Sequence, residues 1–172
     1  MPLPLAVADT SVLINLHHLD LLNSLSLFYR QVLIPSPVRT QFLKRDDSRS
    51  REIALDVLTR QGLFSPCDDY DSVEVDLFKI DKMDEGEAEA LSQLKIRQAD
   101  ILLIDELIGR KIAVRQRRDV SGTASILARL SMNGFTNYWQ SINRLRSESG
   151  FRISNEIAQE ALDEAMRSQT HL

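Results

Sequence analysis

Acidic side chains stand at the ends of two apolar segments that have the character of buried strands. Asp9 follows residues 5–8, and Asp105 with Glu106 follows a second apolar run. A third acidic segment, residues 84–89, opens the helix predicted just before that run. All strands of an open parallel sheet end at one edge, where ligands bind, so the three groups should surround one cleft. Carboxylates held together repel unless protons or cations neutralise them, and hard oxygen ligands suit Mg²⁺ or Mn²⁺.

Each of these acidic groups also has a purely structural interpretation. Asp9 before Thr10 and Ser11 is a common N-cap, and Asp105 could cap the helix that follows it. Glutamates in the first turn of a helix are favoured by the helix dipole without any active site. The functional interpretation rests on the placement of all three groups at one sheet edge, which makes a joint site the hypothesis to test.

The elements that position these acids alternate between short apolar strands and longer amphipathic helices, which is typical of an α/β fold around a parallel sheet. Strands are predicted at residues 5–8, 31–34 and 101–104, with a brief edge strand around Val120. The spacing of apolar residues predicts helical segments at 12–25, 37–43, 53–62, 87–97, 107–117, 123–133, 138–148 and 154–166. A polar loop is predicted at residues 45–51, and residues 65–84 support no firm assignment.

Length and composition place the chain among ordinary globular proteins. Of its 172 residues, 43% are hydrophobic and 27% are charged. A domain of this size buries roughly 70% of the surface of its unfolded chain, so a substantial core is expected. We expect one domain over residues 1–172, with residues 136–172 forming C-terminal helices packed on it. With Cys67 as the single cysteine and three histidines, no Cys/His zinc site can be assembled, so any metal must be held by oxygens.

The sequence also bears on location and on nucleic-acid binding. No apolar run approaches the ~20 residues needed to cross a bilayer, and the first residues lack the basic segment of a signal peptide, so we expect a cytoplasmic protein with no membrane partner. The formal net charge of −4 gives no overall attraction for nucleic acid. The densest basic stretch includes Arg110, Lys111 and Arg115, which either rim the acidic cleft and bind phosphates or form solvated helix surface.

Several segments, in their order along the chain, resemble the successive motifs of the PIN-domain superfamily. They are Asp9–Ile14, Gly86–Leu91, Leu102–Glu106 with Arg110 after it, and Val120–Thr123. They are most similar to the VapC-toxin-like bacterial and archaeal branch of predicted nucleases. The ending, with Gly134-Phe135 and Gly150–Ser154, resembles that branch too, so the similarity covers nearly the whole chain.

This resemblance implies a metal-dependent ribonuclease on a three-layer α/β/α sandwich with a central, mainly parallel sheet. The carboxylates of the family match Asp9 at the end of the first strand and Asp105, with Glu106 beside it, after a later strand. The central acidic position matches Glu89 best and Glu87 less well, because small and apolar residues follow Glu89 as they do in the family.

One position departs from the family pattern. A glutamate that is usual in the helix after the second strand corresponds here to Thr40 or Gln41, and neither is a carboxylate. This difference weakens the expected metal binding. Because Mg²⁺ keeps several waters of its own, two or three carboxylates can still be enough to hold it.

The implied reaction, hydrolysis of RNA phosphodiester bonds, explains why carboxylates are needed. The reaction requires a water deprotonated near neutral pH and stabilisation of transition-state charge, and a divalent metal held by carboxylates supplies both. Asp9 and Asp105 are the expected direct ligands, and Glu89 completes the site or orients the water. The hydroxyls of Thr10 or Ser11 could position a carboxylate or a phosphate.

Two functions therefore remain open. The first is an Mg²⁺- or Mn²⁺-dependent endoribonuclease that acts on RNA and is restrained by a small antitoxin protein. The second is a catalytically weak or inactive relative that keeps the fold as a nucleic-acid-binding or protein-interaction module. The resemblance also implies a homodimer.

Overall fold

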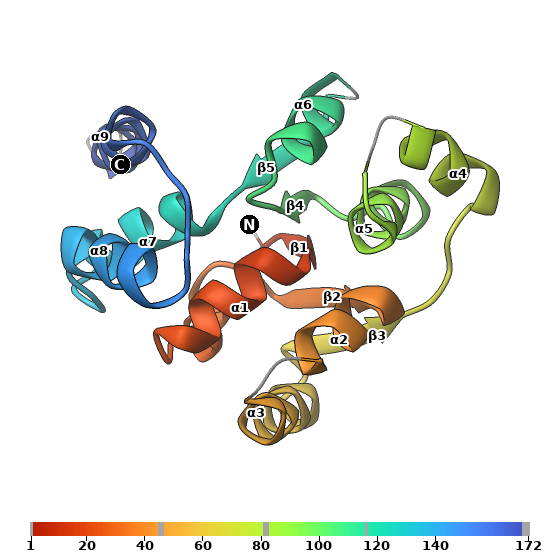
Figure 1. The fold of residues 1–172 in the computed structure, drawn as a ribbon, viewed down its shortest axis with the longest axis horizontal. Helices are drawn as coiled ribbons and strands as arrows, with labels where there is room; N and C mark the ends of the chain where they lie inside the picture. Colours follow the sequence, from red (N-terminus) through yellow and green to blue (C-terminus); the bar gives the residue numbers. More distant parts are fainter. Residues whose placement is uncertain (1, 45–46, 81–82, 116, 170–172) are drawn as a thin grey trace.

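A parallel sheet forms the centre of the computed structural model, which describes residues 2–44, 47–80, 83–115 and 117–169. Its five strands lie in the order β3-β2-β1-β4-β5, and all neighbours are parallel (Figure 1). The strands are β1 (Leu5–Ala8), β2 (Gln31–Pro35), β3 (Phe64–Cys67), β4 (Ile101–Leu103) and β5 (Asp119–Ser121). The sheet order places β1 in the middle, between β2 and β4.

Helices surround this sheet in the described part of the chain. They are α1 (Thr10–His18), the 3-10 helix η1 (Leu22–Leu27), α2 (Ser36–Leu43), α3 (Ser48–Arg60), α4 (Ser72–Ile80), α5 (Glu85–Ile96), α6 (Leu107–Arg115), α7 (Thr123–Met132), α8 (Tyr138–Glu148) and α9 (Asn155–Gln169). Every strand is thus followed by a helix, as parallel strands require a crossover connection.

Different helices cover the two faces of the sheet. Successive residues of a strand point to opposite faces, so the residues of β1 are divided between two hydrophobic cores. Ala6 and Ala8 of β1 lie in a core shared with α1, α2, α3, α7, α8 and α9. Leu5 and Val7 lie in a second core shared with α4, α5 and α6. This arrangement confirms the predicted three-layer α/β/α architecture with a parallel central sheet.

The predicted strands and most of the predicted helices are confirmed, with small shifts at their ends. The helical spacing over residues 12–25 is divided between α1 and η1, with Asp20 at a positive φ of 59° between them. β3 and α4 lie largely within the segment for which no assignment was made. Pro66 obscures the strand pattern of β3, and a proline is tolerated there because β3 is an edge strand.

The prediction of a loop at residues 45–51 is wrong for its second half. Residues 45 and 46 lie outside the described residues, and α3 begins at Ser48. The reason is a tertiary contact of a charged residue. Arg51 is buried, its Nη1 donates to the carbonyl of Phe42 at 3.0 Å, and its guanidinium lies 5.3 Å from the centre of the Phe42 ring.

The C-terminal helices are attached to the layer that contains α7. α9 packs against α7, as Figure 1 shows, and the buried hydroxyl of Tyr138 donates to the carbonyl of Ala158 at 2.6 Å. The hydroxyl of Ser154 accepts a hydrogen bond from the backbone N–H of Ile157 at 3.2 Å, as expected of the predicted helix start. Among the helices described, none is long and apolar enough to cross a membrane.

The hydrogen bond of Tyr138 offers a test of the single-domain prediction. Tyr138→Phe leaves the carbonyl of Ala158 without its buried donor, so we expect a loss of about 0.5–1.5 kcal/mol in the free energy of unfolding. Unfolding in urea should be followed by the fluorescence of Trp139, the only tryptophan, and by far-UV circular dichroism. If α8 and α9 unfold together with the sheet, the two probes give coincident transitions in both proteins. A separate early transition seen by Trp139 would contradict a single cooperative domain.

Candidate active site

A cavity of about 520 Å³ opens at the carboxyl-terminal ends of β1 and β4. Its lining includes Thr10, Ser11, Asn15, Gln41 and the segment Ser149–Arg152. We call it the acidic pocket after its five lining carboxylates, Asp9, Asp84, Glu87, Asp105 and Glu106. The structure therefore brings members of all three acidic segments of the sequence to one place.

Asp9 is both the N-cap of α1 and a wall of the acidic pocket. Its backbone N–H donates to the carbonyl of Leu103 at 2.8 Å, which holds the end of β1 against β4. Its Oδ2 accepts from the backbone N–H of Ser11 at 3.1 Å and from the Ser11 hydroxyl at 2.6 Å. Asp9 is only 4% exposed, and burial raises the pKa of its carboxyl; the Ser11 bonds oppose this rise and the charge of Asp84 adds to it.

Asp105 is held by three donors from two helices. Its Oδ1 accepts from the backbone N–H of Thr123 at 2.7 Å, and its Oδ2 accepts from the Thr123 hydroxyl at 2.5 Å and from Nδ2 of Asn15 at 3.1 Å. Burial raises the pKa of Asp105, while these bonds and the charge of Arg110 act in the opposite direction. The carboxylate thus anchors the first residue of α7.

Glu87 reaches the acidic pocket from the first turn of α5. Asp84 is the N-cap, with its Oδ1 accepting from the backbone N–H of Glu87 at 2.8 Å, and Oε2 of Glu87 accepts from the N–H of Asp84 at 3.1 Å. This reciprocal pair is a capping box. Glu87 is 7% exposed, and burial, aided by the charges of Asp84 and Asp9, raises its pKa to about 7.

Glu89, the preferred central acid of the sequence analysis, does not line the acidic pocket. It is 5% exposed, and its charge contributes to raising the pKa of Cys67 at the end of β3. Two residues along a helix are about 200° apart, so Glu87 and Glu89 face nearly opposite sides of α5. Of the two, Glu87 is therefore the one that lines the acidic pocket together with Asp9.

Of Thr40 and Gln41, the two residues that could correspond to the missing family carboxylate, Gln41 is the one beside Asp9. It lines the acidic pocket, and its Oε1 accepts from the hydroxyl of Thr10 at 2.7 Å, whereas Thr40 is exposed. An amide at this place contributes an oxygen without a charge. The repulsion among the pocket carboxylates is lower than it would be with a glutamate there.

The predicted nucleic-acid-binding residues are divided by the structure. Ser11 lines the acidic pocket, and Arg110 lines a groove beside it. Nη1 of Arg110 donates to the carbonyl of Ile104 at 3.0 Å. Lys111 and Arg115 are exposed on α6 and line neither the pocket nor this groove.

Gly122 makes room for this arrangement. A Cβ atom at Gly122 would lie 2.7 Å from Nη1 of Arg110 and 2.8 Å from Oδ1 of Asp105. Both distances are shorter than van der Waals contact, so a side chain here would displace Arg110, Asp105 or both.

Asn15 is a site residue that the sequence analysis missed. It is buried, its Nδ2 lies 3.1 Å from Asp105 and 3.3 Å from the hydroxyl of Thr123, and its Oδ1 accepts from Ser149 at 3.5 Å. The available signal was a polar residue within the apolar stretch of residues 12–16, four residues after Ser11. Buried polar side chains need partners, and here the partner is a candidate catalytic carboxylate.

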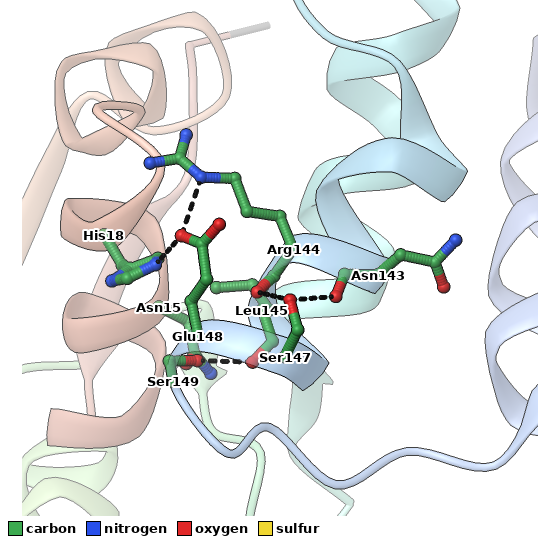
Figure 2. A network of polar contacts seen from close by, with 8 residues as sticks. All are labelled: Asn15, His18, Asn143, Arg144, Leu145, Ser147, Glu148 and Ser149. Atoms are coloured by element: carbon green, nitrogen blue, oxygen red, sulfur yellow. Dashed lines mark hydrogen bonds and ion pairs between the residues drawn. The ribbon is translucent and has the colours of Figure 1, made fainter.

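Figure 2 shows how the end of α8 is attached beside this site. His18 Nε2 lies 2.7 Å from Oε2 of Glu148, which also accepts from Nε of Arg144 at 3.0 Å. The next residue, Ser149, contacts Asn15 and donates to the carbonyl of Leu145 at 2.8 Å. The chain that leaves α8 is thereby held against α1, where it forms one wall of the acidic pocket.

The chemistry of the acidic pocket suits a hydrated divalent cation. Within the described ranges, no three His, Cys, Asp or Glu side chains form a group that could hold a metal ion. Mg²⁺ in proteins is usually bound through one or two carboxylates and keeps several waters. Asp9 and Asp105 are carboxylates with pKa values raised by burial, so a cation beside them would favour their charged forms. The residues fit a cation held by one or two of these side chains, with water as the other ligands.

The raised pKa of Glu87 predicts how stability depends on pH. Its pKa is about 7 in the folded protein against an ordinary 4.5, so the folded state binds the proton more tightly. Its contribution to stability is present at low pH and is lost as the pH rises from 4.5 to 7. As the pH rises over this range, the free energy of unfolding of Glu87→Gln should therefore fall by less than that of the wild-type protein. The difference should be on the order of 1–3 kcal/mol. Urea unfolding in EDTA across this range measures the difference.

A matched control for this measurement is Glu52→Gln, which makes the same substitution on the exposed surface of α3. It should keep the wild-type dependence on pH. Equal slopes for Glu87→Gln and wild type would show that Glu87 does not hold its proton in the folded state.

Comparison with known proteins completes the description of the site. A family model described as a PIN domain matches residues 5–167, which include every strand of the sheet and all five carboxylates of the acidic pocket. None of the curated proteins searched matches the chain. On the extent of the family match, the chain belongs to the PIN-domain family.

Proposed function

We propose that this protein is a divalent-metal-dependent endoribonuclease that hydrolyses RNA phosphodiester bonds. PIN domains are generally nucleases, and membership of this family supports hydrolysis of a nucleic acid. The observation that carries the proposal is the meeting of Asp9, Glu87 and Asp105 around one pocket at the sheet edge. Strand and helix ends supply all three, so rigid elements hold them in place.

In the proposed reaction a water oxygen attacks phosphorus, and the bond from phosphorus to the leaving sugar oxygen breaks. A divalent cation, when bound, would lower the pKa of the attacking water and stabilise the charge that develops on the phosphate. Asp9 and Asp105 would hold this cation, with Ser11, Thr123 and Asn15 fixing the orientation of their carboxylates.

Glu87 is suited to receive the proton that the water loses. A general base works best when its pKa lies near the working pH, and the pKa of Glu87 is about 7. Glu106 is exposed at the rim of the pocket and would add negative charge where a cation enters. Arg110, Lys111 and Arg115 would contact RNA phosphates away from the reacting centre.

The wider biological role is part of the same proposal. The resemblance to VapC-like proteins favours a toxin held in check by a small antitoxin protein, and a homodimer as its assembly. Two exposed apolar side chains support a surface for such a partner. Ile53 and Val57 expose 56% and 43% of their surface on α3, beside one another on the same helix.

A second candidate function is favoured by one specific observation. Gln41 is neutral at the position where the resemblance implies a glutamate. A protein with this change could bind nucleic acid without cleaving it. Such binding would be independent of divalent metal and would weaken steeply with salt.

Cleavage of a mixed pool of single-stranded RNA tests the proposal. Asp9→Asn and Glu87→Gln should each lower the Mg²⁺- or Mn²⁺-dependent rate by about 100-fold or more, because each removes a group assigned to the reacting centre. Glu89→Gln is the matched control, since it makes the same buried substitution two residues away on the other side of α5. It should retain most of the activity.

Circular dichroism of each variant separates loss of activity from loss of fold. Metal-dependent cleavage that persists in a pure Asp9→Asn preparation would overturn the proposed function. RNA binding without cleavage, unchanged by EDTA, would support the binding module instead.

A further inference from the structure

A second cavity adjoins the acidic pocket on the side of the C-terminal helices. It has a volume of about 840 Å³ and lies between α6, the start of α7, α9 and the chain that joins α8 to α9. We call it the arginine groove, after Arg110, Arg146 and Arg152 in its lining. Asp105, Phe151 and Arg152 line both cavities, so a ligand bound in one can extend into the other.

The three arginines of the groove differ in their contacts. Nη2 of Arg146 donates to the carbonyl of Ile153 and to Oδ1 of Asn155, both at 2.9 Å, which fixes the wall between α8 and α9. Arg110 is anchored to the carbonyl of Ile104. Arg152 is exposed at the boundary of the two cavities, and within the described residues it takes part in no recorded ion pair. It is the guanidinium best placed to meet a phosphate that enters from the acidic pocket.

The rest of the lining combines an aromatic ring with apolar surface. Phe151 is partly buried beside Arg152, and Ile157, the first apolar residue of α9, is 55% exposed. Aromatic side chains next to a positively charged groove are a common means of binding single-stranded nucleic acid, because every base can stack on them. A base paired within a duplex has no free face for such stacking, so single strands are favoured over duplex RNA.

Charges on α9 limit where a phosphate can lie in this groove. Glu160 and Glu164 line its far side and would repel a phosphate there. The positive side, with Arg110 and Arg152, is the side next to Asp105. The arrangement therefore favours a phosphate close to the acidic pocket and a base further into the groove.

We infer that the arginine groove binds the nucleotide next to the scissile phosphate of single-stranded RNA, with Arg152 on its phosphate and Phe151 against its base. This inference rests on the proposed function for the identity of the ligand, and adds a subsite outside the reacting centre. It gives the C-terminal segment, which follows the last strand of the sheet, a direct part in substrate binding.

The test measures RNA binding in a cleavage-deficient Asp9→Asn background, with Mg²⁺ present. The probe is a fluorescein-labelled 12-nucleotide single-stranded RNA of mixed sequence, followed by fluorescence anisotropy. Arg152→Gln should weaken binding about 3- to 10-fold and reduce the slope of log affinity against log salt by about 0.7. Phe151→Leu, which keeps an apolar side chain for packing, should weaken binding about fivefold or more with little change in that slope.

Arg167→Gln provides the matched control, because Arg167 is exposed on α9 and does not line the groove. It should bind the probe within about twofold of the background protein, since it lacks a phosphate contact. Circular dichroism should show the same fold for all variants. If Arg152→Gln and Phe151→Leu bind the RNA as Arg167→Gln does, or if the background protein binds no RNA, the inference is overturned. If the groove variants bind RNA as Arg167→Gln does, the groove would instead be a candidate surface for a protein partner.

Cleavage by the protein without the Asp9 substitution separates this inference from the proposed function. Metal-dependent cleavage together with unchanged binding by the groove variants would reject the subsite and keep the nuclease. Absence of cleavage together with groove-dependent RNA binding would reject the nuclease and keep the RNA site.

Discussion

The pairing of β1 with β4 is the constraint on which the candidate site depends. Val7 lies opposite Leu102 and Ala8 opposite Leu103, and the N–H of Asp9 donates to the carbonyl of Leu103. Because the two strands are parallel and in this register, both end at the same level of the sheet. Asp9 and Asp105, 96 positions apart in the chain, therefore line one pocket.

Burying these carboxylates is unfavourable unless their oxygens receive hydrogen bonds. The fold supplies donors from the first turns of two helices, with Ser11 bonded to Asp9 and Thr123 bonded to Asp105. Burial still raises the pKa of both acids. The crowding of carboxylates that opposes stability at neutral pH is also what would favour a bound cation.

The C-terminal helices belong to the same arrangement, although the sheet ends before them. Contacts of Ser149 with Asn15 and of Glu148 with His18 join the end of α8 to α1 (Figure 2). Arg146 then holds the following chain through the carbonyl of Ile153. As a result, the segment after α8 lines both the acidic pocket and the arginine groove. A change in α8 can therefore affect the site without touching a carboxylate.

Much of this molecule was predictable from residue patterns that act locally. Apolar runs followed by an acid indicate strands that end at one edge of the sheet, which is why Asp9 and Asp105 could be predicted to lie beside one cavity. The segment from β3 to α4 was not assigned, because Pro66 and scattered acids hide the periodicity. Arg51 shows the same difficulty in α3, where a buried contact with Phe42 outweighs a polar sequence.

The sequence by itself determined the α/β class, the order of the elements outside the segment of β3 and α4, and the two strand-end aspartates, since these follow from periodicity and from the common direction of parallel strands. Only the tertiary structure decided that Glu87 rather than Glu89 enters the acidic pocket, that Asn15 supports Asp105, and which wall the C-terminal segment forms. The physical reason is that the rotation of α5 and the docking of α8 depend on contacts between residues far apart in the chain. Periodicity within one segment carries no information about such contacts.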